Sequence, residues 1–213
     1  MKILAIDAAL LRAGVAVVDG GAAVEKIFVA GRPGLIETLP VAMRDVLAKA
    51  GPVDAVAVTV GPGSFTGLRT AIALAQGFAA AAGVPGWGVG VEEAFAQAFP
   101  SMHRPLWVAV RARKDRIFLI RDGVAEGFAD ADLPRTRAAV AVAGNAANEV
   151  AAHLAAAGGD VILTNGRAID PVWVARAALA RVAAGLGLRE AVPVYVDPPE
   201  AKLPAGGLRP SPV

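Results

Sequence analysis

The 213-residue sequence has no cysteine, only two histidines, and aromatic residues at just 5% of its positions. The absence of cysteine excludes disulfides and thiolate metal sites. The histidines, His103 and His153, are fifty residues apart, so they do not form the closely spaced pair that a helical metal site needs. No apolar run reaches the roughly 18 residues required to span a bilayer. We therefore expect no bound metal and no membrane-spanning helix.

The chain is instead rich in apolar residues, mostly alanine and branched aliphatics, and 55% of it is hydrophobic. Such a composition is typical of a globular protein, and the length suits one large domain or two small ones. The net charge of +2 neither requires nor excludes a nucleic-acid partner. Because Asp7 interrupts the first apolar run after a few residues, the N-terminus lacks a secretory pattern, and we expect a cytoplasmic protein.

Hydrophobic periodicity predicts an α/β fold in which one order of elements occurs twice. The first set contains strands near 2–8, 14–18, 24–29, 53–60 and Trp87, and helices over 35–49, 67–82 and 92–99. A boundary at residues 100–105 separates it from a second set. That set contains strands near 106–110, 116–121, 127, 140–143 and 161–164, and helices over 146–157 and 171–184.

The most specific string in the sequence is GPGSFTGLR, at residues 61–69, which follows a strand pattern and opens a helix. Gly61 and Gly63 allow backbone angles that other residues avoid, and Ser64 or Thr66 can cap the helix. Such a turn can hold an anion at the free N–H groups of the helix. It can also simply let the strand and the helix pack closely. Both interpretations remain open at the level of the residues.

This string, the apolar helix behind it and VPGWGV at residues 84–89 resemble the signature of the TsaB (YeaZ) family, bacterial subunits that support tRNA threonylcarbamoyladenosine synthesis. MKILAID at residues 1–7 and PVYVDPPEAKLP at residues 193–204 fit the same family. The resemblance implies the duplicated, ribonuclease H-like fold of actin, Hsp70 and sugar kinases, with a degenerate second half. It also implies an N-terminal half at 1–102, carrying the signature and the dimerisation helices, and a smaller C-terminal half at 103–213.

Proteins of that superfamily use an acidic residue in each half to position magnesium for a nucleotide. The sequence keeps the first acid, Asp7, but alanines follow it where the family usually has hydroxyl side chains. The second acid is missing, because Arg111 stands at the position where the family has an aspartate. A guanidinium cannot ligate magnesium, so we expect no catalytic residue and no cofactor, ATP and ADP included. A vestigial nucleotide site would use Asp7, Gly61, Gly63, Ser64 and Thr66. Alternatively, Asp7 makes a structural hydrogen bond at the end of its strand.

The helix over residues 68–82 is apolar nearly all round, since after Arg69 its only polar side chains are Thr70 and Gln76. A surface helix normally has a polar face, so this one is either enclosed within the monomer or covered by another chain. The helix over residues 35–49 could pack beside it. The predicted partner interface consists of Leu39, Met43, Val46, Leu47, Arg69, Ala73, Gln76 and Ala80.

The resemblance implies a non-catalytic subunit that binds and activates a TsaD-like catalytic homologue, with a TsaE-like ATPase joining the complex and a homodimer forming when the chain is alone. We expect tRNA to be bound mainly through the complex. A cluster of cations beside Asp115 either contacts the tRNA backbone or is simply solvated. It comprises Arg104, Arg111, Arg113, Lys114, Arg116 and Arg121.

Two enzymatic alternatives remain. One is a nucleotide-dependent phosphotransferase or ATPase of the same superfamily. The other is a glycoprotease-like hydrolase. The hydrolase is disfavoured because Ser64 lacks the flanking glycines of a nucleophile elbow.

Overall fold

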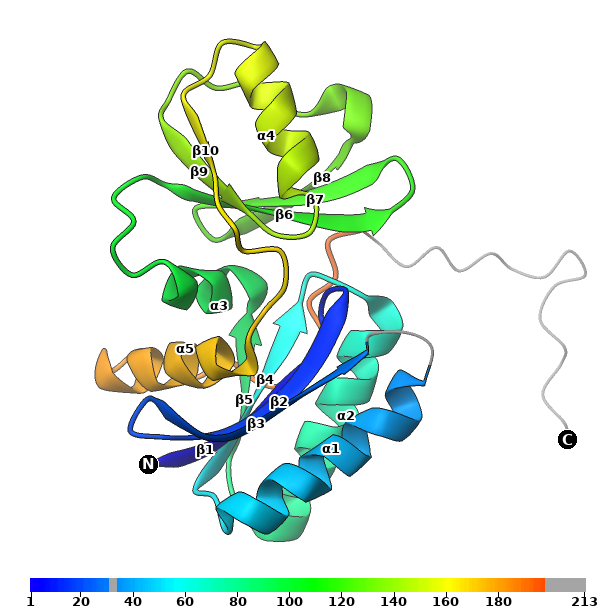
Figure 1. Ribbon diagram of the computed structural model, residues 1–213, viewed down its shortest axis with the longest axis vertical. Coiled ribbons are helices and arrows are strands. Elements are labelled where there is room, and N and C mark those ends of the chain that lie inside the picture. Colours follow the sequence, from blue (N-terminus) through cyan, green and yellow to red (C-terminus); the bar gives the residue numbers. More distant parts are fainter. Residues whose placement is uncertain (31–33, 198–213) are drawn as a thin grey trace, which may run out of the picture.

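The computed structural model describes residues 1–30 and 34–197, which form two five-stranded sheets in two halves, one above the other (Figure 1). The first sheet contains β1 (Lys2–Asp7), β2 (Arg12–Asp19), β3 (Ala22–Ala30), β4 (Ala55–Gly61) and β5 (Gly86–Gly90). The second sheet contains β6 (Leu106–Arg113), β7 (Arg116–Arg121), β8 (Val124–Ala129), β9 (Val140–Ala143) and β10 (Val161–Leu163).

Both sheets have the same topology. The first has the order β3-β2-β1-β4-β5, and the second, read from its other edge, has the order β8-β7-β6-β9-β10. In each, the central strand pairs antiparallel with the strand that follows it in sequence and parallel with the fourth. This repetition confirms the duplicated, actin-like and ribonuclease H-like α/β fold that the sequence predicted.

The two sheets differ in their helices, which are α1 (Leu35–Ala50), α2 (Phe65–Ala82), α3 (Val91–Ala98), α4 (Ala147–Ala156) and α5 (Pro171–Ala183). Helices α1 and α2 lie side by side on one face of the first sheet, and α5 covers the opposite face (Figure 1). Helix α4 packs on the second sheet, where a short 3-10 turn at Asp130–Asp132 replaces a counterpart of α1. The second half is thus the reduced copy.

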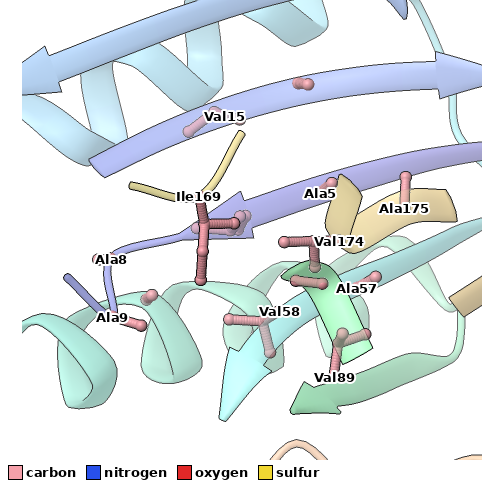
Figure 2. Packing of buried hydrophobic residues seen from close by; sticks show 14 of the residues in the cluster. Ala5, Ala8, Ala9, Val15, Ala57, Val58, Val89, Ile169, Val174 and Ala175 are labelled. Carbon is pink, nitrogen blue, oxygen red and sulfur yellow. The ribbon is translucent and has the colours of Figure 1, made fainter. Parts of the chain in front are cut away.

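Helix α5 belongs to the predicted C-terminal half in sequence, yet it packs on the first sheet. Asp170 caps it by accepting the Val172 N–H at 3.0 Å, and Pro171 occupies its first turn, where a missing N–H costs nothing. Val174 and Ala175 then lie among core residues of β1 and β4 (Figure 2). The first sheet is therefore buried on both faces, one of them by a helix from the far end of the chain.

The segment at residues 189–197 also returns to the first half. The Gly88 N–H donates to the Arg189 carbonyl oxygen at 2.7 Å, and the Val194 N–H donates to Val60 at 2.8 Å. Its end reaches the second sheet, where Asp197 pairs with Arg116 at 2.5 Å. This segment thereby ties the two sheets together along one side. Residues 198–204 of the family-like string lie outside the described residues.

Strands and helices fall where hydrophobic periodicity placed them, with ends shifted by a few residues. The largest shifts lengthen strands: β2 begins at Arg12, and β6 continues to Arg113. Across residues 1–30 and 34–197, every helix is too short or too polar to cross a bilayer.

Candidate functional site

The glycine-rich loop between β4 and α2 packs directly on the hairpin that joins β1 to β2. The Ser64 N–H donates to the Ala9 carbonyl oxygen at 2.7 Å. A Cβ atom added at Gly63 or Gly67 would collide with carbonyl oxygens of that hairpin. Ser64 caps α2, because its Oγ accepts the Gly67 N–H at 3.3 Å, whereas Thr66 lies inside the first turn. These glycines serve close packing, and anion binding at the loop stays a prediction.

Gly61, at the end of β4, is required by the backbone itself. Its φ of 117° lies in the left-handed region that favours glycine, and a Cβ there would come 2.9 Å from the Val194 carbonyl oxygen. Gly144, directly after the equivalent strand β9, has a φ of 101°. In each half, the strand that pairs parallel with the central strand therefore ends at or just before a glycine with a positive φ.

Asp7 is fully buried at the end of β1. Its Oδ1 accepts the Thr59 hydroxyl at 2.7 Å and the Ala9 N–H at 3.1 Å, while Oδ2 is buried without a hydrogen-bond partner. Burial raises the pKa of Asp7 to about 7, although the bond from Thr59 opposes the shift. The structural hydrogen bond foreseen for Asp7 is present.

Arg111 holds the matching position in the second half, and its side chain pairs within the chain. The guanidinium donates to both carboxylate oxygens of Asp130, at 2.6 and 2.7 Å, and to Glu149 at 3.1 Å. Its backbone N–H donates to Asn145 Oδ1 at 2.8 Å. Among the described residues, no group of three or more His, Asp or Glu side chains is arranged to hold a metal ion. The absence of a bound nucleotide stays a prediction.

Four of the six cations in this cluster form ion pairs with carboxylates, of which Glu126 is near in sequence and the others are 19 or more residues away. The pairs are Arg104 with Asp160, Arg111 with Asp130 and Glu149, Arg116 with Asp197, and Arg121 with Glu126. Asp115 is the one acid within residues 104–121, so these opposing acids all lie outside the cluster. A contact between this hairpin and tRNA stays a prediction, and the ion pairs lessen its electrostatic basis.

The predicted interface on α1 needs correction. Leu39 and Val46 are fully buried in the core, so they are not available to a partner. They face inward because α1 packs on β2 and β3, and residues four and seven apart share one face of a helix. Met43 and Leu47 lie at the margin of that face and are partly buried. They remain candidates for contact with another chain.

The outer face of α2 is exposed, as an interface requires. Arg69, Ala73, Gln76, Gly77 and Ala80 form this outer face, and the inward face buries Leu68, Ala71, Ile72 and Ala75 against the sheet. After Arg69 the outer face carries no charged side chain. Gln76 is partly engaged, since its Nε2 donates to the Ala191 carbonyl oxygen at 2.8 Å. The possibility that α2 is enclosed within the monomer is therefore wrong.

A cavity of about 430 Å³ lies between the start of α2, the β6–β7 hairpin and the segment at 189–197. We call it the Phe65 cavity. Its wall is mostly apolar and includes Phe65, Arg69, Arg113, Phe118, Tyr195 and Asp197. The Arg69 guanidinium lies 3.9 Å above the Phe65 ring and donates to the Tyr195 hydroxyl at 3.1 Å. The Phe65 side chain is 56% exposed and the Tyr195 side chain is 51% exposed, although the chain contains few aromatic residues.

The sequence did not predict this cavity, because its walls come from three segments far apart in the chain. A signal was nevertheless present in the sequence. Phe65 lies in the string GPGSFTGLR and Tyr195 in the string PVYVDPPEAKLP, and both strings contribute to the family resemblance. Their scarcity in this composition makes such rings candidates for contact with another molecule.

The comparisons with known proteins agree with the fold and the signature. Residues 35–162 match the family model described as "TsaD: tRNA N6-adenosine threonylcarbamoyltransferase". The chain is 37% identical, over 101 residues, to the tRNA threonylcarbamoyladenosine biosynthesis protein TsaB of Escherichia coli. That match covers 46% of this chain and 43% of the relative, less than half of each.

Two crystal structures from Pseudomonas aeruginosa share the fold. One, YeaZ, has a TM-score of 0.70 at 24% identity, covering 91% of this chain and 99% of the other. The second, described as an uncharacterized protein with similarity to peptidase YEAZ, has a TM-score of 0.69 at 24% identity, covering 92% and 99%.

Fold and site together define a duplicated α/β protein of the actin and sugar-kinase class, with a buried aspartate in one hairpin and an ion-paired arginine in the other. Within that class, the chain belongs to the family described by the TsaD model, and the likeness to the TsaB protein of Escherichia coli agrees with the resemblance of its glycine-rich string.

Proposed function

We propose that the protein is a non-catalytic subunit in tRNA threonylcarbamoyladenosine biosynthesis, which binds and activates a TsaD-like catalytic homologue. The description of the matched family and the name of the Escherichia coli relative support the pathway. The absence of catalysis is supported by Asp7 and Arg111, since each makes its contacts inside the chain. The ATPase and hydrolase alternatives gain no support from these contacts.

The observation that carries the proposal is the outer face of α2. Exposed Ala73, Gly77 and Ala80 give a helix surface without bulk or charge, and small residues let a second helix approach closely. An exposed apolar surface of this kind marks a site of protein association. Met43 and Leu47 of α1 extend it, because α1 packs beside α2 on the same face of the sheet.

In this proposal the outer face of α2 serves two assemblies. Alone, the chain forms a homodimer through it. With the catalytic homologue present, the same face forms the heterodimer, a TsaE-like ATPase joins that complex, and tRNA is bound mainly by the assembled subunits. The protein would then act where those subunits act, in the cytoplasm.

A charge placed on the outer face tests the proposal. We expect Ala73→Glu and Ala80→Glu each to weaken both assemblies about tenfold or more, because a buried unpaired carboxylate opposes association. Sedimentation velocity measures the homodimer, and titration with the TsaD-like homologue measures the heterodimer. Ala152→Glu, at an exposed position of α4, is the matched control and should leave both unchanged.

Reconstitution then tests activation. Threonylcarbamoylation of tRNA by the catalytic homologue should depend on this chain and should fall with Ala73→Glu in proportion to the lost complex. Full activity of the homologue without this chain, or unaltered association of both glutamate variants, would contradict the proposal.

A further inference from the structure

The Phe65 cavity has the size and lining of a small-molecule site. Its volume of about 430 Å³ lies within the range of ligand pockets, and its wall is largely apolar with a few polar groups at one side. Three separate segments form the wall, and the hydrogen bond between Val194 and Val60 fixes one of them. The cavity is therefore part of the folded structure and does not require a partner to form it.

Aromatic rings line one side of this space. The Phe65 and Tyr195 rings have centroids 6.2 Å apart and are tilted by 38°, and Phe118 contributes a third ring. The Arg69 guanidinium stacks on the Phe65 ring. Exposed rings fixed in this way present flat apolar surfaces on which a planar ligand can pack.

The charge of the wall is positive. Arg69 and Arg113 line the cavity, and among the lining residues that the structure describes, Asp197 is the one acid. Arg116 donates to that acid at 2.5 and 3.2 Å, and this contact, together with the charge of Arg113, lowers the pKa of Asp197. Within residues 1–30 and 34–197, Arg69 contacts the Tyr195 hydroxyl and the Phe65 ring, which are both neutral, and forms no ion pair with a carboxylate.

The Tyr195 hydroxyl adds a donor at the same place. Because this oxygen accepts the Arg69 N–H, the hydroxyl keeps its own proton for a further acceptor. Guanidinium groups bind carboxylate and phosphate groups through two parallel hydrogen bonds. Rings, two arginines and a phenol thus converge on one apolar space.

We propose that the Phe65 cavity binds a small aromatic anion, a planar ring that carries a carboxylate or a phosphate. The ring packs against Phe65 and Tyr195, and the anionic group is bound by Arg69 and Arg113. This site lies at the start of α2 and shares Arg69 with the outer face of that helix, whereas Ala73 and Ala80, which test the proposed assembly, do not line the cavity.

Calorimetric titration of the full chain with four probes tests the assignment. Indole-3-acetate carries a ring with a carboxylate, and AMP carries a ring with a phosphate. Indole is a ring alone, and inorganic phosphate is an anion alone. We expect at least one ring-anion probe to bind about tenfold or more tightly than both single-feature probes. The tighter of the two identifies the anion that the site prefers.

Variants locate the binding. Arg113→Gln should weaken the preferred probe about tenfold, and Ala112→Leu should do the same by filling the cavity without changing its charge. Lys114→Gln is the matched control, since it removes one positive charge from an exposed neighbour that does not line the cavity. Urea unfolding of each variant confirms that the fold is intact.

Three results would overturn the assignment. The first is equal affinity for indole and indole-3-acetate, and the second is an equal loss of probe affinity in Arg113→Gln and Lys114→Gln. The third is no measurable binding of any of the four probes, which is the result expected if the cavity takes a protein segment. Ala73→Glu, which tests assembly, should bind the probes normally, so each proposal can fail without the other.

Discussion

The hairpins that begin the two sheets occupy the same place in the duplicated fold but are held in opposite ways. In the first, Asp7 is enclosed and receives hydrogen bonds from Thr59 and Ala9. In the second, Arg111 lies near the surface and pairs with Asp130 and Glu149. The first hairpin is thus stabilised through a buried carboxyl, and the second through partly exposed ion pairs.

The two sheets also differ in how completely helices cover their faces. The first sheet has helices on both faces, including α5 from the end of the chain. The second has α4 and no counterpart of α1, and two of the three residues of its edge strand β10 are exposed. The first half therefore carries most of the larger cluster of buried residues and, on α2, an apolar surface directed outward.

The largest expected effect comes from the packing of the signature loop on the first hairpin. Gly67→Ala should destabilise the protein by about 4 kcal/mol or more, because the new Cβ meets a backbone carbonyl that cannot move aside. Gly77→Ala in the same helix is the matched control. It enters open space and should stabilise by up to about 1 kcal/mol through helix propensity. Urea unfolding measures both, and similar stability of the two variants would rule out the close packing.

Asp7 should make stability depend on pH. Its folded-state pKa of about 7 lies above the ordinary value of 3.8, so the folded chain keeps a proton that the unfolded chain releases. Stability should therefore fall as pH rises from about 4 to about 7 and stay level above that. Relative to the wild type, Asp7→Asn should gain up to about 4 kcal/mol across this range.

The measurement is the difference in unfolding free energy between Asp7→Asn and the wild type at several pH values from 4 to 8. The prediction concerns how this difference changes with pH. A destabilisation by the buried amide that is the same at every pH therefore does not affect the result. Parallel stability curves for the two proteins would show that Asp7 is ionised normally.

The smallest effect belongs to the second hairpin. Arg111→Gln should lower the unfolding free energy by about 1 kcal/mol in dilute buffer and by less in 1 M salt, because its partly exposed ion pairs are screened. Thr59→Val, which removes a buried hydrogen bond at the first hairpin, should cost a similar amount that salt does not change. Equal salt dependence of the two variants would show that ion pairs do not stabilise the second hairpin more than the first.

Much of the fold could be predicted from the sequence, because local periodicity and turn residues specify elements. The strand before Gly61, the cap at Ser64 and the proline at the start of α5 all act over a few residues. The duplication followed from the order of the elements.

The interface was harder to predict. Helix α1 has one apolar stripe, and Leu39 and Val46 within it are used by the sheet, so only its margins remain for a partner. Periodicity identifies such a stripe without saying what covers it.

The sequence by itself determined the α/β elements, their repetition, the family signature, and the lack of cysteine. Only the tertiary structure decided that Asp7 is enclosed, that distant acids neutralise the cations, and that Phe65, Arg113 and Tyr195 share one cavity. The physical reason is distance along the chain. Propensity and periodicity act between neighbours, whereas burial, ion pairing and cavity shape arise where remote segments meet.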